Sequence, residues 1–123
     1  MRTVNKPWGY EKRVWMDDLN DVWLMYFRSV GGASSLHRHP NKRKVLVVLR
    51  GSAVMTVGDV SEVFGQYGSQ VVERDVPHRQ VALVAGTEIL EIESPPNKTD
   101  IVRLSDLYGR EGKPYEDPSA GDR

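Results

Sequence analysis

Between residues 22 and 92 this chain contains a series of short runs of β-branched and aromatic residues, each bounded by glycine or proline. Glycine and proline favour turns, whereas β-branched and aromatic residues favour strands. The pattern predicts strands at residues 22–30, 44–49, 53–57, 60–64, 70–73, 80–84 and 88–92. Strands this short and this closely spaced are typical of an all-β sandwich or barrel of the jelly-roll kind.

Length, charge and the lack of cysteine narrow the class of protein further. The chain has 123 residues, enough for a single domain, and its 17 basic residues balance 17 acidic ones. The chain therefore has no net charge that would attract it to nucleic acid or to a charged membrane surface. Without cysteine, neither disulfides nor thiolate metal sites can form. Residues 1–10 do not resemble a secretory signal and no apolar run is long enough to span a membrane, so we expect a cytoplasmic protein.

The two ends of the chain differ from its middle. We expect residues 1–15 to form an extended N-terminal arm, residues 16–104 to form the barrel, and residues 105–123 to form a polar and partly mobile tail. Residues 101–104 fit either one more strand or a short helical turn.

Three histidines are the candidate metal ligands. His37 and His39 are two positions apart, so in a strand their side chains point to the same face. His78 follows a proline and opens a later strand. Three neutral imidazoles leave open positions on a divalent ion (Zn, Mn, Fe or Ni), as in a catalytic rather than a structural site. The alternative is three ordinary surface histidines.

The spacing around the first two histidines resembles the first motif of the cupins. That motif has a glycine, five residues, His-x-His, three or four residues, a glutamate, six residues and a second glycine. Here Gly31, His37, His39 and Gly51 match at these spacings, and Lys44 replaces the glutamate. The resemblance implies a single-domain cupin jelly-roll β-barrel.

The second cupin motif is matched less fully. His78 fits its histidine, whereas Glu73-Arg74-Asp75 replaces its usual turn and Ala82 replaces its asparagine. The three histidines then correspond to the metal ligands of the family.

Both ends of the chain resemble the cupin domain of type II mannose-6-phosphate isomerases. The matching segments are Lys6-Pro7-Trp8-Gly9-Tyr10-Glu11 and Asp100-Ile101-Val102-Arg103-Leu104-Ser105-Asp106-Leu107-Tyr108-Gly109-Arg110. The resemblance implies a small cupin related to sugar-phosphate enzymes. In such isomerases a divalent metal polarises the substrate carbonyl and hydroxyl while a base moves a proton through an enediol.

Lys44 is the departure from the cupin pattern. Strand alternation puts Lys44, Leu46 and Val48 on one face, which the cupin register turns inward. Three outcomes follow: three histidines alone hold the metal, Lys44 binds an anionic group of the substrate or relays a proton, or the metal is lost and a cationic pocket remains. In a register shifted by one residue, Lys44 would instead point to solvent.

Four further residues are candidates for the site. Glu73 or Asp75 could supply the missing acid as ligand or base, or could be solvated turn charges. Gln80 shares a face with His78 and could hydrogen-bond the substrate. Arg28 could reach in as an anion-binding fork or extend to solvent at the core edge.

Three functions fit these residues. The leading hypothesis is a metal-dependent isomerase or epimerase of a small sugar phosphate or related anionic substrate. The alternatives are a three-histidine Fe(II) dioxygenase of a small polar substrate and a non-catalytic cupin that binds a small ligand. Residues 45–49 are apolar on both faces, so we also expect a homodimer.

Overall fold

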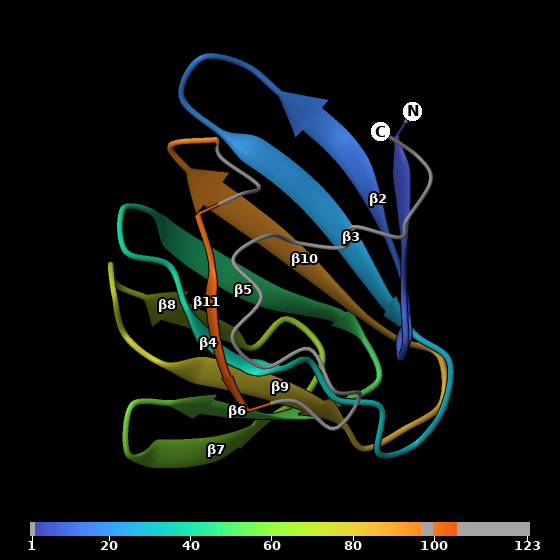
Figure 1. The fold of residues 1–123 in the computed structure, drawn as a ribbon. Coiled ribbons are helices and arrows are strands. Elements are labelled where there is room, and N and C mark those ends of the chain that lie inside the picture. The colour runs from blue at the N-terminus through green and yellow to red at the C-terminus, as the bar shows by residue number, and fades with distance from the viewer. Residues whose placement is uncertain (1, 97–99, 106–123) are drawn as a thin grey trace.

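The protein is a two-sheet structure built only of strands. The computed structural model describes residues 2–96 and 100–105. Because no helix occurs among these residues, none there is long and apolar enough to cross a membrane. The strands (Figure 1) are β1 (Thr3–Lys6), β2 (Gly9–Met16), β3 (Asp21–Phe27), β4 (Leu36–Arg38), β5 (Arg43–Arg50), β6 (Ala53–Val57), β7 (Val60–Phe64), β8 (Ser69–Val72), β9 (His78–Ala82), β10 (Thr87–Ser94) and β11 (Val102–Ser105).

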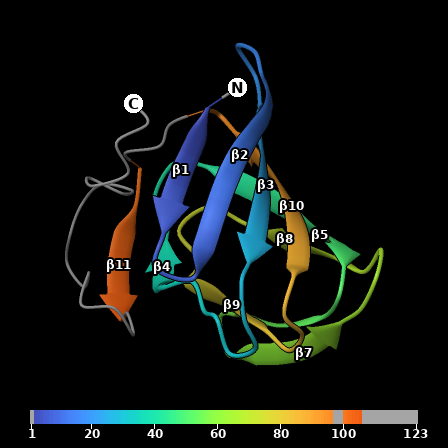
Figure 2. The same cartoon turned by 90° about the vertical axis from the view of Figure 1, so that its right-hand side faces the viewer.

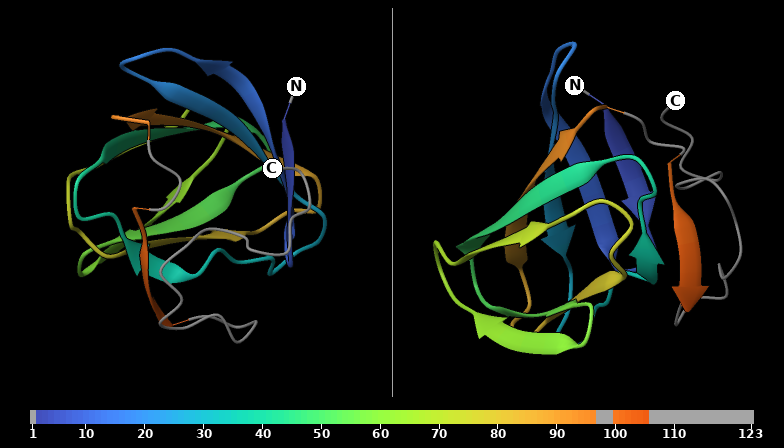
Figure 3. Two further views of the ribbon diagram at one scale, coloured as in Figure 1. Left: turned by 45° about the horizontal axis from the view of Figure 1, so that its top comes forward. Right: turned by 90° about the vertical axis from the view of Figure 1, so that its left-hand side faces the viewer.

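The strands form two antiparallel sheets that face each other around a closed interior (Figure 3). The larger sheet has the order β1-β2-β3-β10-β5-β8, and the smaller has the order β11-β4-β9-β6-β7. Strands that are neighbours in a sheet are often distant in sequence, as in the pairing of β3 with β10. This arrangement confirms the predicted all-β jelly roll.

The seven predicted strands correspond to β3 and to β5 through β10. The chain before them forms two further strands, β1 and β2, which pair at the edge of the larger sheet. The close approach of two backbones explains the glycine in this segment: a Cβ at Gly9 would lie 1.7 Å from the carbonyl oxygen of Tyr26. Residues 102–105 form a strand rather than a helical turn. Almost all of the predicted polar tail lies outside the described residues.

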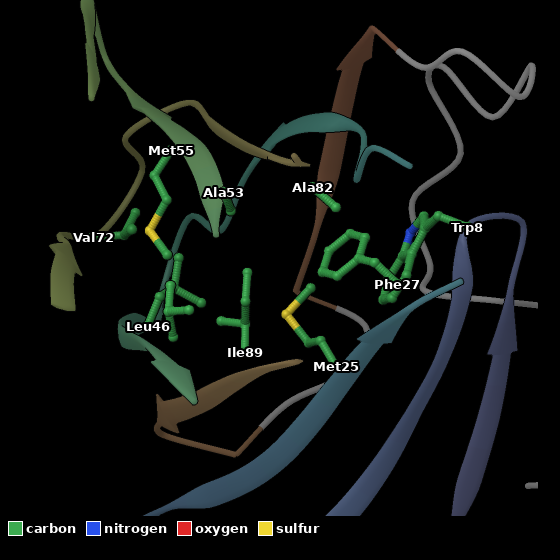
Figure 4. Close-up of a cluster of buried hydrophobic side chains, with 10 residues drawn as sticks. Trp8, Met25, Phe27, Leu46, Ala53, Met55, Val72, Ala82 and Ile89 are labelled. Atoms are coloured by element: carbon green, nitrogen blue, oxygen red, sulfur yellow. The ribbon is translucent and has the colours of Figure 1, made fainter. Parts of the chain in front are cut away.

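The apolar core lies between the two sheets (Figure 4). The rings of Trp8 and Phe27 stack with their centroids 4.3 Å apart. Leu46, Met55 and Ile89 are fully or almost fully buried beside them. The other members of the cluster are Met25, Val48, Ala53, Val72 and Ala82. Burial of such side chains supplies the main favourable free energy of folding.

The interior changes from apolar to charged along two central strands. On β5 the buried face carries Lys44, Leu46 and Val48. On β10 it carries Ile89, then Glu91 and Glu93 toward the strand's end. Because the two strands are antiparallel neighbours, their charged halves lie together and their apolar halves lie together. The fold thereby places a charged compartment at one end of the interior.

Candidate metal centre

The structure brings the three predicted histidines together in this charged compartment. His37 lies in β4, His39 directly follows that strand, and His78 begins β9, where it is opposite His37 in the sheet register. The ring centroids are 4.3 Å apart for His37 and His78, and 4.8 and 5.2 Å from each of these to His39. All three side chains are buried, and one potential ligand atom from each lies within 4.8 Å of the others. They are therefore not ordinary surface histidines.

Main-chain carbonyls fix the orientation of all three rings. A carbonyl oxygen can only accept a hydrogen bond, so each Nδ1 carries a proton, and in a neutral ring Nε2 then keeps its lone pair. This is the tautomer that metal-binding histidines use, with the second nitrogen held by an outer-shell acceptor. The three contacts are His37 Nδ1 to Ser35 O at 2.7 Å, His39 Nδ1 to Asp100 O at 2.5 Å and His78 Nδ1 to Val76 O at 2.9 Å.

His37 is in the protonation state that a metal requires. Burial lowers the pKa of its imidazole well below the usual value, and the nearby His78, Lys44 and His39 lower that pKa further. The ring is therefore neutral at pH 7. Three imidazole nitrogens suit a divalent transition metal such as zinc, iron or nickel.

Lys44 points into the interior, so the alternative register with Lys44 in solvent is wrong. Its side chain is 2% exposed and its ammonium lies 2.9 Å from a carboxylate oxygen of Glu91. A second pair, Lys42 and Glu93, lies close by along the same two strands, with 3.0 Å between Nζ and Oε2 and both side chains fully buried. Each lysine therefore has a carboxylate partner on β10, and Lys44 is not a lone cation beside the histidines.

A small cavity adjoins the histidines. It has a volume of about 20 Å³, which is space for one or two water molecules. Its lining residues come from both sheets, and Figure 2 shows β1 and β2 of the larger sheet on the same side of the molecule as β4 and β11 of the smaller one. Its lining consists of Lys6, Trp8, Glu11, Met25, Ser34, Ser35, His37, Lys44, Glu91, Ile101 and Arg103.

Gln80 lies where the sequence pattern expects it, buried on the same face of β9 as His78. The Ser34 hydroxyl donates to Oε1 of Gln80 at 3.1 Å and accepts from its backbone N–H at 2.9 Å. Because Ser34 lines the cavity, Gln80 supports the cavity wall from behind.

The structure does not bring Glu73, Asp75 or Arg28 to the histidines. The Glu73 carboxylate is exposed and pairs with the Arg43 guanidinium at 3.0 Å. Asp75 is exposed and pairs with Arg38. Arg28 is exposed at the end of β3, where its guanidinium donates to the carbonyls of Gly9 and Pro7 at 3.2 and 3.3 Å. These three side chains are tied to the surface of the fold.

The acids that do lie in the compartment are Glu91, Glu93 and Glu11, which the sequence reasoning did not select. The sequence feature that could have identified Glu91 and Glu93 is the alternation along β10, which places both on the same face as Ile89. Alternating charges in a strand ordinarily mark the solvent face, which hides such an arrangement from pattern analysis.

Residues near the C-terminal end of the described chain complete the surroundings of the histidines. The Asp100 carboxylate accepts hydrogen bonds from the backbone N–H of Asn41 at 2.8 Å and from its side-chain amide at 3.0 Å, while its carbonyl holds His39. In β11, Arg103 is opposite His37 in the register. The last described strand is thus part of the wall of the compartment.

The structure explains why one glycine of the first cupin-like motif is required. Gly51 has φ +79°, and a Cβ there would lie 2.4 Å from Oγ1 of Thr87. Side chains other than hydrogen are excluded both by the left-handed backbone and by this contact. The turn between β5 and β6 therefore requires glycine.

No family model matches the sequence, and no curated protein is similar to it. Solved structures are similar in fold. KdgF from a Halomonas species is 17% identical with a TM-score of 0.72, over 75% of this chain and 83% of that one. An RmlC-like cupin from Shewanella frigidimarina is 20% identical with a TM-score of 0.71, over 78% and 85%. A sugar phosphate isomerase from a cupin superfamily, from Silicibacter pomeroyi, is 16% identical with a TM-score of 0.66, over 80% and 66%.

These similarities concern the fold, since the identities are low, and the resemblance to mannose-6-phosphate isomerases stays a prediction. The topology, the buried histidines and the match to solved cupins agree with one another. The chain has the jelly-roll fold of the cupin superfamily.

Proposed function

We propose that this protein is a metal-dependent cupin enzyme that isomerises or epimerises a small anionic sugar or sugar-like substrate. The observation that carries the proposal is the trio of buried histidines whose Nδ1 atoms are all held by main-chain carbonyls. His37, His39 and His78 would hold one divalent ion through Nε2. When bound, that ion supplies Lewis-acid polarisation of a substrate carbonyl and hydroxyl.

Glu91 is the best candidate for the base. Its carboxylate lines the cavity beside His37 and is held by the Lys44 ammonium at 2.9 Å. In this proposal Glu91 accepts a proton from the carbon next to the substrate carbonyl and returns it to the former carbonyl carbon, while the hydroxyl proton passes to the former carbonyl oxygen. An epimerase would need a second acid on the opposite face of the substrate to return the proton there. Lys44 holds the carboxylate in place and donates a hydrogen bond to the enediol oxygen. Glu91 takes the role that the sequence analysis offered to Glu73.

One observation favours the Fe(II) dioxygenase as the second candidate. The cluster of potential ligands contains three histidines and no carboxylate. A site without an acidic ligand is what the three-histidine alternative requires. The likeness to a sugar phosphate isomerase in fold favours the first candidate.

Metal analysis of untagged protein tests the proposal. We expect about one zinc or manganese ion per chain, which His78→Ala removes. Iron together with substrate-dependent oxygen uptake would favour the dioxygenase. Absence of metal above background, with ligand binding unchanged in His37→Ala, would exclude both enzymes.

The proton step has its own test. Wild-type protein loaded with zinc is incubated in D₂O with phosphorylated and carboxylated sugars, starting with mannose 6-phosphate, and deuterium incorporation next to the carbonyl is followed by NMR. Glu91→Gln and Lys44→Gln should each slow the exchange about 100-fold or more while zinc is retained. Arg38→Gln, a change to an ion pair with the exposed Asp75, is the matched control.

We also propose that the protein is a homodimer. Val45, Val47 and Leu49, on the outward face of β5, are only half-buried in the single chain. A second copy packed on this face would remove the remaining apolar surface from water. Sedimentation equilibrium that gives the mass of one chain would refute the dimer.

A further inference from the structure

The side chain of Gln80 carries a hydrogen-bond donor that the fold does not use. Gln80 is fully buried on the inner face of β9. Its Nε2 has no hydrogen-bond partner within residues 2–96 and 100–105, the part of the chain that the structure describes. A buried amide group without a partner costs free energy that native folds ordinarily avoid. A donor left open at this depth therefore points to an acceptor that comes from outside the chain.

Ser34 fixes which end of the Gln80 amide is left open. The backbone N–H of Gln80 donates to Oγ of Ser34 at 2.9 Å, and the Ser34 hydroxyl donates its single proton to Oε1 of Gln80 at 3.1 Å. With the amide reversed, that proton would have only the Gln80 carbonyl oxygen, at the longer distance of 3.5 Å. Oε1 therefore faces Ser34, and the donor Nε2 is held in a fixed position for a ligand.

Gln80 lies between the histidines and the apolar core. The inner face of β9 carries His78, Gln80 and Ala82 in that order, and Ala82 belongs to the apolar cluster (Figure 4). In the neighbouring strand β6, Gln80 is opposite Met55, which belongs to the same cluster. Alternate side chains of a strand share one face, so a molecule that is held at the histidines and extends along β9 meets Gln80 next.

The chemistry of the open group determines what it can bind. Nε2 is uncharged and can only donate, so its partner is an acceptor such as a carbonyl, hydroxyl or carboxylate oxygen. A buried donor also discriminates between ligands, because a ligand without a matching acceptor leaves the donor unpaired. Gln80 therefore suits a ligand that has one oxygen for the ion and a neighbouring oxygen for the amide.

We propose that Gln80 is a specificity-determining residue that donates a hydrogen bond from Nε2 to an oxygen atom of the substrate held at the three histidines. The inference rests on the proposed function, because it concerns the ligand of that same site. It narrows the substrate class to compounds with two neighbouring oxygen atoms, such as α-hydroxy carbonyl compounds and carboxylates. Ser34 is a positioning residue, since it acts through the Gln80 amide.

Ligand binding by the cobalt-loaded, full-length protein tests this role. The visible absorption of Co²⁺ reports small ligands that bind the ion, and the two probes are acetate and imidazole. Coordinated acetate keeps a second oxygen that can accept from Nε2, whereas coordinated imidazole offers only an N–H donor. We expect Gln80→Met to weaken acetate binding about tenfold or more and imidazole binding less than about twofold, the effect of one buried hydrogen bond. Gln66→Met, the same change at an exposed glutamine, should alter neither.

Thermal unfolding of the metal-free protein gives a second readout. Gln80→Met removes a donor that has no partner, and it leaves the Ser34 hydroxyl an acceptor in the carbonyl oxygen of residue 80. Its Tm should therefore equal or exceed that of the wild type. A purely structural glutamine would instead give a loss of about 4 °C or more and an equal weakening of both probes, and this result would overturn the proposal.

The outcomes separate the role of Gln80 from the proposed function. A wild type that takes up no cobalt would refute the metal centre and the role of Gln80 with it. Cobalt uptake without acetate binding, or acetate binding unchanged in Gln80→Met, would refute the role of Gln80 alone. If Gln80→Met does not fold, Gln80→Glu decides the question, because it keeps an oxygen for Ser34 and replaces the donor with an acceptor. This variant should weaken acetate binding and strengthen imidazole binding, and the absence of that reversal would overturn the proposal.

Discussion

The two halves of the barrel interior are built from the same strands with opposite chemistry. In the apolar half, Leu46 of β5 and Ile89 of β10 are fully buried among hydrophobic side chains. In the charged half, Lys44 of β5 and Glu91 of β10 are almost as deeply buried and pair with each other. The difference teaches that burial alone does not distinguish core from site in this protein. The core and the site differ in whether a buried side chain needs a charged or hydrogen-bonding partner.

The two halves contribute differently to stability. Burial of a large apolar side chain contributes about 1.5–3 kcal/mol relative to leaving it exposed. A buried ion pair gains little or nothing over apolar residues of similar volume, because desolvation offsets the attraction between the charges. The apolar half therefore stabilises the fold, and the charged half is retained at some cost to stability.

The largest effect is expected from breaking a buried ion pair. Glu93→Leu leaves the fully buried Lys42 ammonium without the carboxylate that lies 3.0 Å away. We expect a loss of about 3–5 kcal/mol in the free energy of unfolding, measured by chemical denaturation. The double variant Lys42→Met/Glu93→Leu should recover most of that loss, since it removes both charges. A double variant as unstable as the single one would contradict this account of the charged half.

A cavity in the apolar half should have a somewhat smaller effect. Leu46→Ala removes a fully buried side chain and should lower the free energy of unfolding by about 2–4 kcal/mol. Zinc stoichiometry should stay the same, because Leu46 contacts the apolar cluster rather than the histidines. Loss of metal in this variant, under conditions where it is folded, would show that the two halves are coupled.

The outer contacts of the histidines should affect metal affinity more than stability. Asn41→Ala removes the side-chain hydrogen bond to the Asp100 carboxylate and leaves only the backbone N–H to hold the residue whose carbonyl orients His39. We expect zinc affinity to fall about tenfold in competition with a chelator, since outer-shell changes at metal sites have effects of this size. Gln66→Ala, which removes an exposed contact to the Leu49 carbonyl, should leave the affinity unchanged.

The smallest effect is expected from mild acid. Burial keeps the pKa of folded His37 well below its value in the unfolded chain, which is about 6.5. The unfolded state therefore takes up a proton that the folded state does not, and stability is lost as pH falls below about 6.5. At pH 5.5, in EDTA to keep the histidines free of metal, we expect this proton uptake to lower the free energy of unfolding by an amount on the order of 1 kcal/mol. A His37→Gln variant should have a shallower pH dependence between pH 7.5 and 5.5, and an equal slope would contradict the assignment.

Local patterns in the sequence were sufficient to predict most of the fold. Turn residues and β-branched runs identified β3 and β5 through β10, because both signals act within a few neighbours. The same patterns missed β1 and β2. The pairing of Gly9 with Phe27 depends on a backbone contact that is distant in sequence, and no local signal reports it.

The sequence was sufficient to predict the candidate metal ligands but not the charged residues that surround them. The spacing of His37, His39 and His78 was sufficient to select the three histidines. Alternation together with the cupin register predicted that Lys44 points inward, and a register shifted by one residue was the alternative. Its partner Glu91 lies 47 residues further along the chain, and only the pairing of β5 with β10 brings the two together. The residues around Lys44 in the sequence cannot show this neighbour, so the sequence analysis assigned the missing acid of the site to Glu73 or Asp75.

The orientation of the histidines by main-chain oxygens has a consequence for mutational scanning. Every amino acid has the same carbonyl, so substitutions at Ser35, Val76 and Asp100 leave in place the oxygens that accept from Nδ1. A saturation library would therefore register Ser35 and Val76 as tolerant at the ring contacts themselves, although each contact orients a ligand. At Asp100 it would register only the loss of the carboxylate contact with Asn41. The contribution of the carbonyl contacts becomes visible only when the backbone is altered, for example by an amide-to-ester replacement that weakens the carbonyl as an acceptor.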